Sequence, residues 1–225
     1  MTTSGTYLFA PAIGDLILDA FSRCQVKRTE ITPQHIADAK LAANFVQLTW
    51  SNDGITLWSV DQQTIPLVQG TATYTVPANT VMITDLYIVI AGGSDRLILP
   101  FSRTDFASLA KPTEQGIPTS FWFDRLLAPT VTFWPVPDGN ENSAVYWRYR
   151  NIQDANMSQG GNAEIPYLGL DAFAAGLAHR LSRSYAPALE QQRKMDYQEA
   201  YQLFAKQFTE NVPMYISPGL SGYFR

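Results

Sequence analysis

Apolar residues recur at helical spacing near both ends of the chain and at strand spacing between them. The first helical stretch begins after Pro11 and repeats an apolar residue every three or four positions, at Ile13, Leu16, Ile17, Ala20, Phe21 and Cys24. This period collects the apolar side chains on one face of an amphipathic helix. We therefore predict a helix whose apolar face packs against another element.

A second helix is predicted to begin at Thr32-Pro33, because threonine caps a helix N-terminus and proline suits the first turn. Its apolar positions continue for four turns, at Ile36, Ala39, Ala43, Val46 and Trp50. The turn-forming residues 51–54 (Ser-Asn-Asp-Gly) are expected to end it.

Two further helices are predicted within residues 166–211, joined at Ala186-Pro187. Their apolar faces are formed by Leu170, Phe173, Leu177, Leu181 and Tyr185 in the first, and by Tyr197, Ala200, Tyr201, Phe204 and Phe208 in the second. Polar residues of the first helix are expected to point away from the core, namely His179, Arg180, Ser182 and Arg183. Such helices are not stable alone in water, so the simplest packing joins the pairs from the two chain ends.

Between residues 55 and 161 the period changes to that of strands. Short runs rich in β-branched and aromatic residues, bounded by Gly, Pro, Asn or Asp, lie at 57–67, 71–76, 81–91, 96–101, 120–124, 130–134 and 144–150. Turn residues at 92–95 and 137–140 are expected to join neighbouring runs into hairpins, and 105–109 to form one helical turn.

Together these elements predict an α+β fold in which a four-helix bundle, built from the N- and C-terminal helix pairs, carries an inserted antiparallel β-sandwich or barrel. The expected divisions are residues 1–54 for the first helix pair, 55–161 for the β domain, 162–211 for the second helix pair and 212–225 for an extended docking tail.

The tail contains helix-breaking proline and glycine, yet many of its residues are apolar. A segment that stayed extended in solvent would normally be polar, so this one is expected to dock. Two alternatives remain open, its own domain or a groove on another subunit or a different protein. The candidate partner-interface residues are Val212, Met214, Tyr215, Ile216, Leu220, Tyr223, Phe224 and Arg225.

Composition narrows the classes of function. The 225 residues carry a formal net charge of -4, whereas proteins that clamp nucleic-acid phosphates usually present a basic face. The single cysteine, Cys24, cannot form an internal disulfide. No stretch approaches the about 20 apolar residues of a membrane span, and no secretion signal is recognised, so we expect a protein that is cytosolic at synthesis.

No motif for nucleophilic, metal or phosphate chemistry is present, so we predict no catalytic, cofactor-binding or metal-binding residues. His35, in a first helical turn, and His179 are interpreted as surface or capping residues. Two alternatives are kept. Glu114 and Asp124 are the first candidates for the carboxylate pair of a cell-wall glycosidase. A carbohydrate-binding module could stack sugars on aromatic residues, although a β core explains these better: Trp58, Trp122, Phe123, Trp134, Tyr146 and Trp147.

The order of the elements, with several short motifs, resembles the head-to-tail adaptor proteins of tailed bacteriophages, particularly the tail tubular protein A type. The motifs are GTATYTVP at 70–77, Gly-Ile-Pro at 116–118, WPVPD at 134–138, residues 148–154, and Ile165-Pro166 leading into 177–181. The resemblance spans nearly the whole chain.

This resemblance implies a non-enzymatic structural protein of the virion neck, present in the host cytoplasm during assembly. It implies a dodecameric ring beneath the portal protein that lines the DNA channel and receives a downstream tail or nozzle protein. Genomic DNA would pass without specific binding, which agrees with the mildly acidic composition. The resemblance also implies that the apolar tail reaches the portal, and it involves no membrane and no cofactor.

Overall fold

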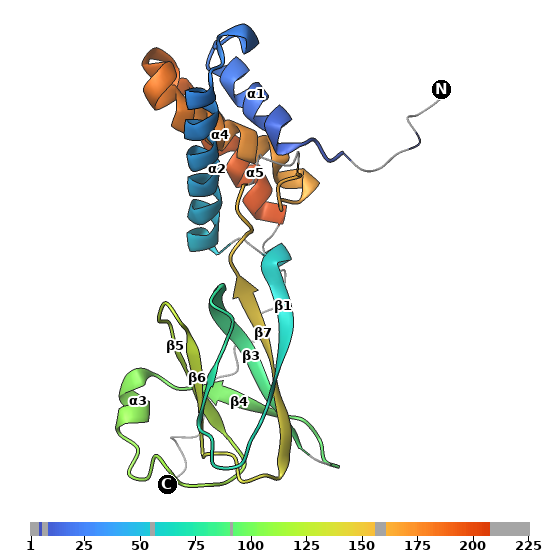
Figure 1. The fold of residues 1–225 in the computed structure, drawn as a ribbon, viewed down its shortest axis with the longest axis vertical. Coiled ribbons are helices and arrows are strands. Elements are labelled where there is room, and N and C mark those ends of the chain that lie inside the picture. Colours follow the sequence, from blue (N-terminus) through green and yellow to red (C-terminus); the bar gives the residue numbers. More distant parts are fainter. Residues whose placement is uncertain (1–4, 6–8, 55–56, 91, 156–160, 208–225) are drawn as a thin grey trace, which may run out of the picture.

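A computed structural model describes residues 5, 9–54, 57–90, 92–155 and 161–207. The molecule is elongated, with helices at one end and strands at the other (Figure 1). Two separate hydrophobic cores correspond to these ends, one among the helices and one within the sheet. The predicted α+β class is confirmed, while the domain boundaries drawn from the sequence stay a prediction.

Four long helices share the first core: α1 (Ile13–Arg23), α2 (Pro33–Asp53), α4 (Leu170–Tyr185) and α5 (Glu190–Gln207). The predicted cap of α2 is confirmed, because Thr32 Oγ1 accepts the backbone N–H of His35 at 3.4 Å. The helix ends at Gly54, whose φ of 73° lies in the left-handed region that favours glycine. Short 3₁₀ turns, Arg28–Glu30 and Tyr167–Gly169, precede α2 and α4.

Helix α4 is central, because α1, α2 and α5 all pack against it. Residues 172–179 are consequently buried on every side, and most of them are alanine or glycine. A Cβ added at Gly176 would lie 2.8 Å from the Tyr197 ring, so glycine permits the close approach of α5. The prediction that His179 and Ser182 point away from the core is wrong, because they are 8% and 0% exposed, and the His179 ring stacks on Tyr197 of α5.

All seven predicted strands are present near their expected positions: β1 (Val60–Pro66), β2 (Thr73–Thr75), β3 (Thr80–Ile90), β4 (Arg96–Pro100), β5 (Ser120–Asp124), β6 (Thr130–Trp134) and β7 (Glu141–Arg150). The run predicted as a strand at 57–67 begins with a 3₁₀ turn, Leu57–Ser59, and becomes a strand at Val60. The expected helical turn is α3 (Arg103–Ala107).

The strands form one curled sheet in the order β1-β7-β3-β4-β5-β6-β2. The finer prediction of a sandwich or barrel is therefore not confirmed, and neither is the strict four-helix bundle. Strands β1 and β2 form the two edges of the sheet. They are nevertheless consecutive in the chain, so the short loop 67–72 runs from one edge to the other. Within this loop Leu67 N–H donates to Asn142 O, and Gly70 N–H donates to Pro137 O. The curl encloses the second core.

Two details of strand pairing differ from the prediction. Strands β4 and β5 are parallel, because residues 101–119 are long enough to carry the chain back to the same end of the sheet. The turn at 137–140 joins β6 to β7, which pair with other strands and form no hairpin with each other. The turn at 92–95 does connect an antiparallel pair, β3 and β4.

The prediction that six aromatic residues form the β core is also corrected by the structure. Only Tyr146 is fully buried in it, because the buried side of β7 carries Ala144, Tyr146 and Arg148. Trp147 points the other way and is 40% exposed. Trp58 packs on the helical core instead, beside Trp50 and Phe204.

Candidate functional site

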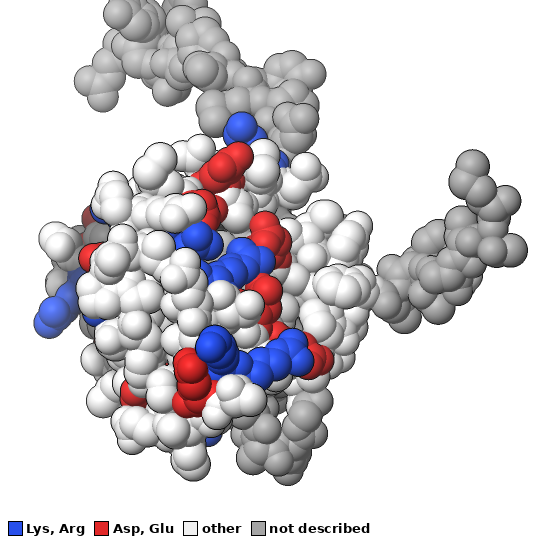
Figure 2. Space-filling model, turned by 90° about the horizontal axis from the view of Figure 1, so that it is seen from above, with Lys and Arg blue, Asp and Glu red and all other residues white. Residues whose placement is uncertain are grey.

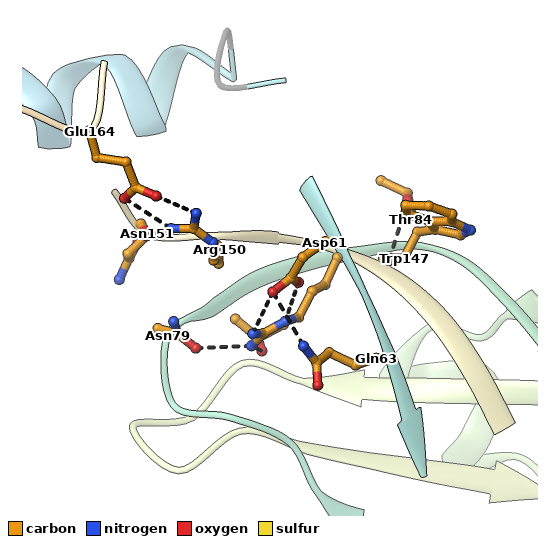
Figure 3. Close-up of polar contacts among 10 residues, drawn as sticks. Asp61, Gln63, Asn79, Thr84, Trp147, Arg150, Asn151 and Glu164 are labelled. Carbon is orange, nitrogen blue, oxygen red and sulfur yellow. Dashed lines mark hydrogen bonds and ion pairs between the residues drawn. The ribbon is translucent and has the colours of Figure 1, made fainter. Parts of the chain in front are cut away.

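Polar side chains tie the sheet to the helices where the chain returns from β7 to α4. Arg150 Nη1 donates to Glu164 Oε2 at 3.0 Å, and Nη2 pairs with the other carboxylate oxygen. The same carboxylate accepts the backbone N–H of Gln153 at 2.8 Å. Figure 3 shows Arg150 and Glu164 facing each other at the end of the strand. This bidentate ion pair fixes the return crossing.

The outward crossing, from α2 to β1, is anchored at the same place. The Trp58 ring packs against Trp50 and Phe204, and its indole N–H donates to the backbone oxygen of Glu164 at 3.1 Å. Helix α2 also holds the returning chain, because Asn44 Oδ1 accepts the backbone N–H of Ala155 at 2.9 Å. Both crossings therefore depend on contacts around Glu164.

A second charged pair lies within the sheet, beneath the joint. Arg148 is only 4% exposed, and its guanidinium donates to Asp61 Oδ1 at 2.7 Å and Oδ2 at 3.1 Å. Its remaining nitrogen, Nη1, donates to Asn79 Oδ1 at 2.9 Å and Thr80 Oγ1 at 2.7 Å. Figure 3 places Asp61, Asn79 and Gln63 around this position. Because the buried charge is paired and hydrogen-bonded, it can be accommodated.

These pairs predict a loss of stability in acid. The Arg150 guanidinium lowers the pKa of Glu164, and Arg148 lowers that of Asp61. A carboxylate whose pKa is depressed by folding stabilises the protein above its unfolded value and loses that contribution as pH falls through the folded value. We expect urea unfolding to show a free energy of unfolding that declines from about pH 5 downward.

The control for this prediction is Glu164→Gln, which keeps the shape of the side chain without its charge. The variant should be less stable than wild type at pH 7, and the two stability curves should converge in acid. An equal difference in stability at every pH would show that the Glu164 charge does not contribute.

Exposed leucines lie on the outer side of the sheet. By strand register Thr64, Val145, Tyr87 and Leu97 form one row across four strands. Leu97, at the end of this row, and Leu99, two residues further along β4, are 62% and 65% exposed. The exposure of these leucines is not among the predictions from the sequence, although three consecutive apolar residues at 97–99 indicate a strand that is apolar on both sides. Clustered exposed apolar residues are typical of interaction sites.

The sequence predicts two kinds of site outside the joint, a docking tail and, as an alternative, a pair of catalytic carboxylates. The tail residues 212–225 lie outside the described residues, so their docking stays a prediction. Glu114 and Asp124 lie toward opposite ends of the β5–β6 pair, because Asp124 pairs with Thr130 and the neighbouring Gln115 with Val136. Six residues of strand span roughly 20 Å, well beyond the about 5 to 10 Å of a glycosidase pair. The glycosidase alternative therefore gains no support.

The histidines show no sign of metal chemistry. His35 caps α2, as predicted, and its ring stacks on Tyr185 with centroids 4.5 Å apart. Burial lowers the pKa of His179, whose ring stacks on Tyr197. Within the described ranges, His, Cys, Asp and Glu side chains form no group that could hold a metal ion. The same part of the chain has no helix long and apolar enough to cross a membrane.

Comparison with known proteins identifies one family. The chain matches no curated protein. The sequence profile of the SU10 adaptor protein family matches residues 8–217, which include every helix and strand described above. This match supports a structural role as a phage head-to-tail adaptor, located at the virion neck and associated with portal and tail proteins. The tail tubular protein A type is not confirmed by it. The chain belongs to the SU10 adaptor protein family, a family of phage adaptors.

Proposed function

We propose that copies of this protein form a dodecameric ring beneath the portal, line the channel through which the genome leaves, and present a platform for the next tail component. The observation that carries the proposal is the family match over residues 8–217. The elongated shape supports it, because the helical and sheet ends have separate cores and can meet different neighbours (Figure 1).

Charge on the surface also supports the proposal. The chain carries a net charge of -4, and basic and acidic side chains are interspersed over the helical end (Figure 2). Each phosphate that a protein neutralises adds salt-dependent affinity for DNA. A channel wall with mixed charge lets DNA slide.

The tail is the proposed contact with the portal, through the apolar residues from Val212 to Phe224 and Arg225. Aromatic anchors of this kind commonly dominate the energy of an interface. Deleting residues 212–225 should leave a folded protein that no longer joins the head. Circular dichroism and thermal unfolding would report the fold, and co-sedimentation with portal-containing heads would report binding.

A control variant for the deletion replaces Tyr215, Ile216, Tyr223 and Phe224 by serine, which keeps the length of the tail. This variant should lose binding to the same extent. If the truncated chain unfolds or aggregates, the tail belongs to the core of its own domain, and the proposed portal contact is wrong.

A further inference from the structure

Helix α2 has two apolar faces, of which only one is buried. Its inner face is formed by Ala39, Ala43, Val46 and Trp50. On the outer face Leu41, Phe45 and Leu48 are 57%, 45% and 50% exposed. Spacings of four and three residues place these three side chains in one stripe along the helix. An exposed apolar stripe of this kind on a packed helix indicates an interaction surface.

Leu41 and Phe45 of the stripe line a groove between α2 and α4 that also contains Arg180. Arg180 lies with its guanidinium carbon 5.6 Å from the centre of the Phe45 ring, and it donates to Thr49 Oγ1 at 2.9 Å. Arg183 and Asp38 also line this groove. Arg183 is paired with Glu190, its Nε lying 3.2 Å from Oε1, whereas Arg180 donates to neutral oxygens of Phe45 and Thr49, so Arg180 is the cation that this groove can offer to a partner.

A second apolar surface lies between α1 and the beginning of α4. Phe9, Tyr167 and Leu168 are 70%, 66% and 47% exposed there. Phe9 lines two neighbouring grooves that also share Pro11 and Leu170. Tyr167 lines one of these grooves, and Leu168 follows it directly in the chain.

The rim of this second surface is acidic. The groove between α1 and α4 carries Asp15, Asp19, Asp171 and Arg23. Arg23 bridges Asp19 and Asp171 at 2.8 Å each. Three aspartates against one arginine leave a net negative charge at this rim, which is complementary to the guanidinium of Arg180 beside the first surface.

The two surfaces point in opposite directions. Asp171 and Arg180 are nine residues apart on α4, which at 3.6 residues per turn is two and a half turns, or roughly 180° around the helix. Helices α1 and α2 both pack on α4, and Arg23 of α1 bonds Asp171 while Thr49 of α2 accepts from Arg180. A contact between different, nearly opposite surfaces of identical subunits repeats from copy to copy and generates a ring or a filament.

We propose that the stripe Leu41, Phe45 and Leu48 of one copy docks on the Phe9, Tyr167 and Leu168 surface of the next copy, with Arg180 facing the aspartates of α1 and α4. This contact would be the seam between neighbouring subunits of the proposed ring. That this contact closes into a ring rests on the proposed function.

Cysteine cross-linking in the full-length protein tests the contact. The single native cysteine, Cys24, is buried, and burial raises the pKa of its thiol, so it should react little with a bis-maleimide linker. A variant with both Leu48→Cys and Leu168→Cys should give a ladder of covalent dimers, trimers and longer chains on a denaturing gel. Leu48→Cys mixed with Leu168→Cys should give a dimer and nothing longer. Each single variant alone should give no dimer.

A control for random collision combines Leu48→Cys with Leu127→Cys, because Leu127 is fully exposed on the sheet and lies outside both surfaces. This variant should give no ladder. A dimer from Leu48→Cys alone would indicate a symmetric contact and overturn the proposal. Absence of the ladder, or an equal ladder in the control, would also overturn it, including the case in which the chain's own tail covers the stripe.

Binding to the portal, measured with the same variants under reducing conditions, separates the two hypotheses. A ladder without portal binding would contradict the proposed function and retain this contact. Portal binding without a ladder would retain the adaptor role and overturn this contact.

Discussion

Replacing Asp61 by alanine should lower the free energy of unfolding by about 3 kcal/mol. The change removes the carboxylate that accepts two hydrogen bonds from Arg148 and leaves a guanidinium that is 4% exposed without its counter-charge. Breaking a buried ion pair by removing one partner costs about 3 to 5 kcal/mol. We expect the lower end of this range because Asn79 and Thr80 still accept from Arg148, and because the Asp61 side chain is 34% exposed and admits water.

Urea unfolding at pH 7 measures this effect, and a double variant shows its cause. Asp61→Leu combined with Arg148→Met removes both charges and keeps the volume apolar, and such replacements of buried pairs are often neutral. The double variant should therefore be more stable than Asp61→Ala. If it is equally unstable, the loss comes from packing around Asp61 and the unpaired charge is not its cause.

The sequence alone predicts most of the local structure. Apolar residues at a period near 3.6 predict the helices, and turn residues divide the β region into its seven strands, because these signals depend on a few neighbouring residues. The parallel pairing of β4 with β5 is set by contacts across a long connection, and no local pattern encodes it. The predicted exposure of the His179 side chain is wrong for a related reason. Its solvent exposure depends on a third helix packing on α4, and the sequence of α4 does not show how many neighbours it has.

The interaction surfaces were harder to predict than the elements. In α2 the apolar residues at 41, 45 and 48 alternate with the buried set, so the helix is apolar on two sides and its periodicity is weak. Burial of one side by α4 is what identifies the other as a surface stripe. The candidate tail was predicted from composition, because apolar residues beside proline and glycine indicate docking without a helix.

Replacing Trp50 by alanine should have an effect as large as the loss of Asp61 or larger. Trp50 is completely buried in the last turns of α2, and its ring contacts Trp58, Phe173 and Phe204. Its indole N–H also donates to the Tyr197 hydroxyl at 3.1 Å. Truncating a buried tryptophan to alanine costs about 3 to 5 kcal/mol, against a total stability of about 5 to 15 kcal/mol for a typical domain.

The consequence should extend beyond the helices, because Trp58, which packs on Trp50, also holds the backbone of Glu164 at the joint with the sheet. Thermal unfolding and urea titration measure the loss of stability in Trp50→Ala. The matched control is Trp147→Ala, the same substitution at a tryptophan that is 40% exposed on the sheet, where a smaller loss is expected because less apolar area leaves water there. A comparable loss in both variants would mean that Trp50 has no special place in the helical core, and that the joint does not depend on it.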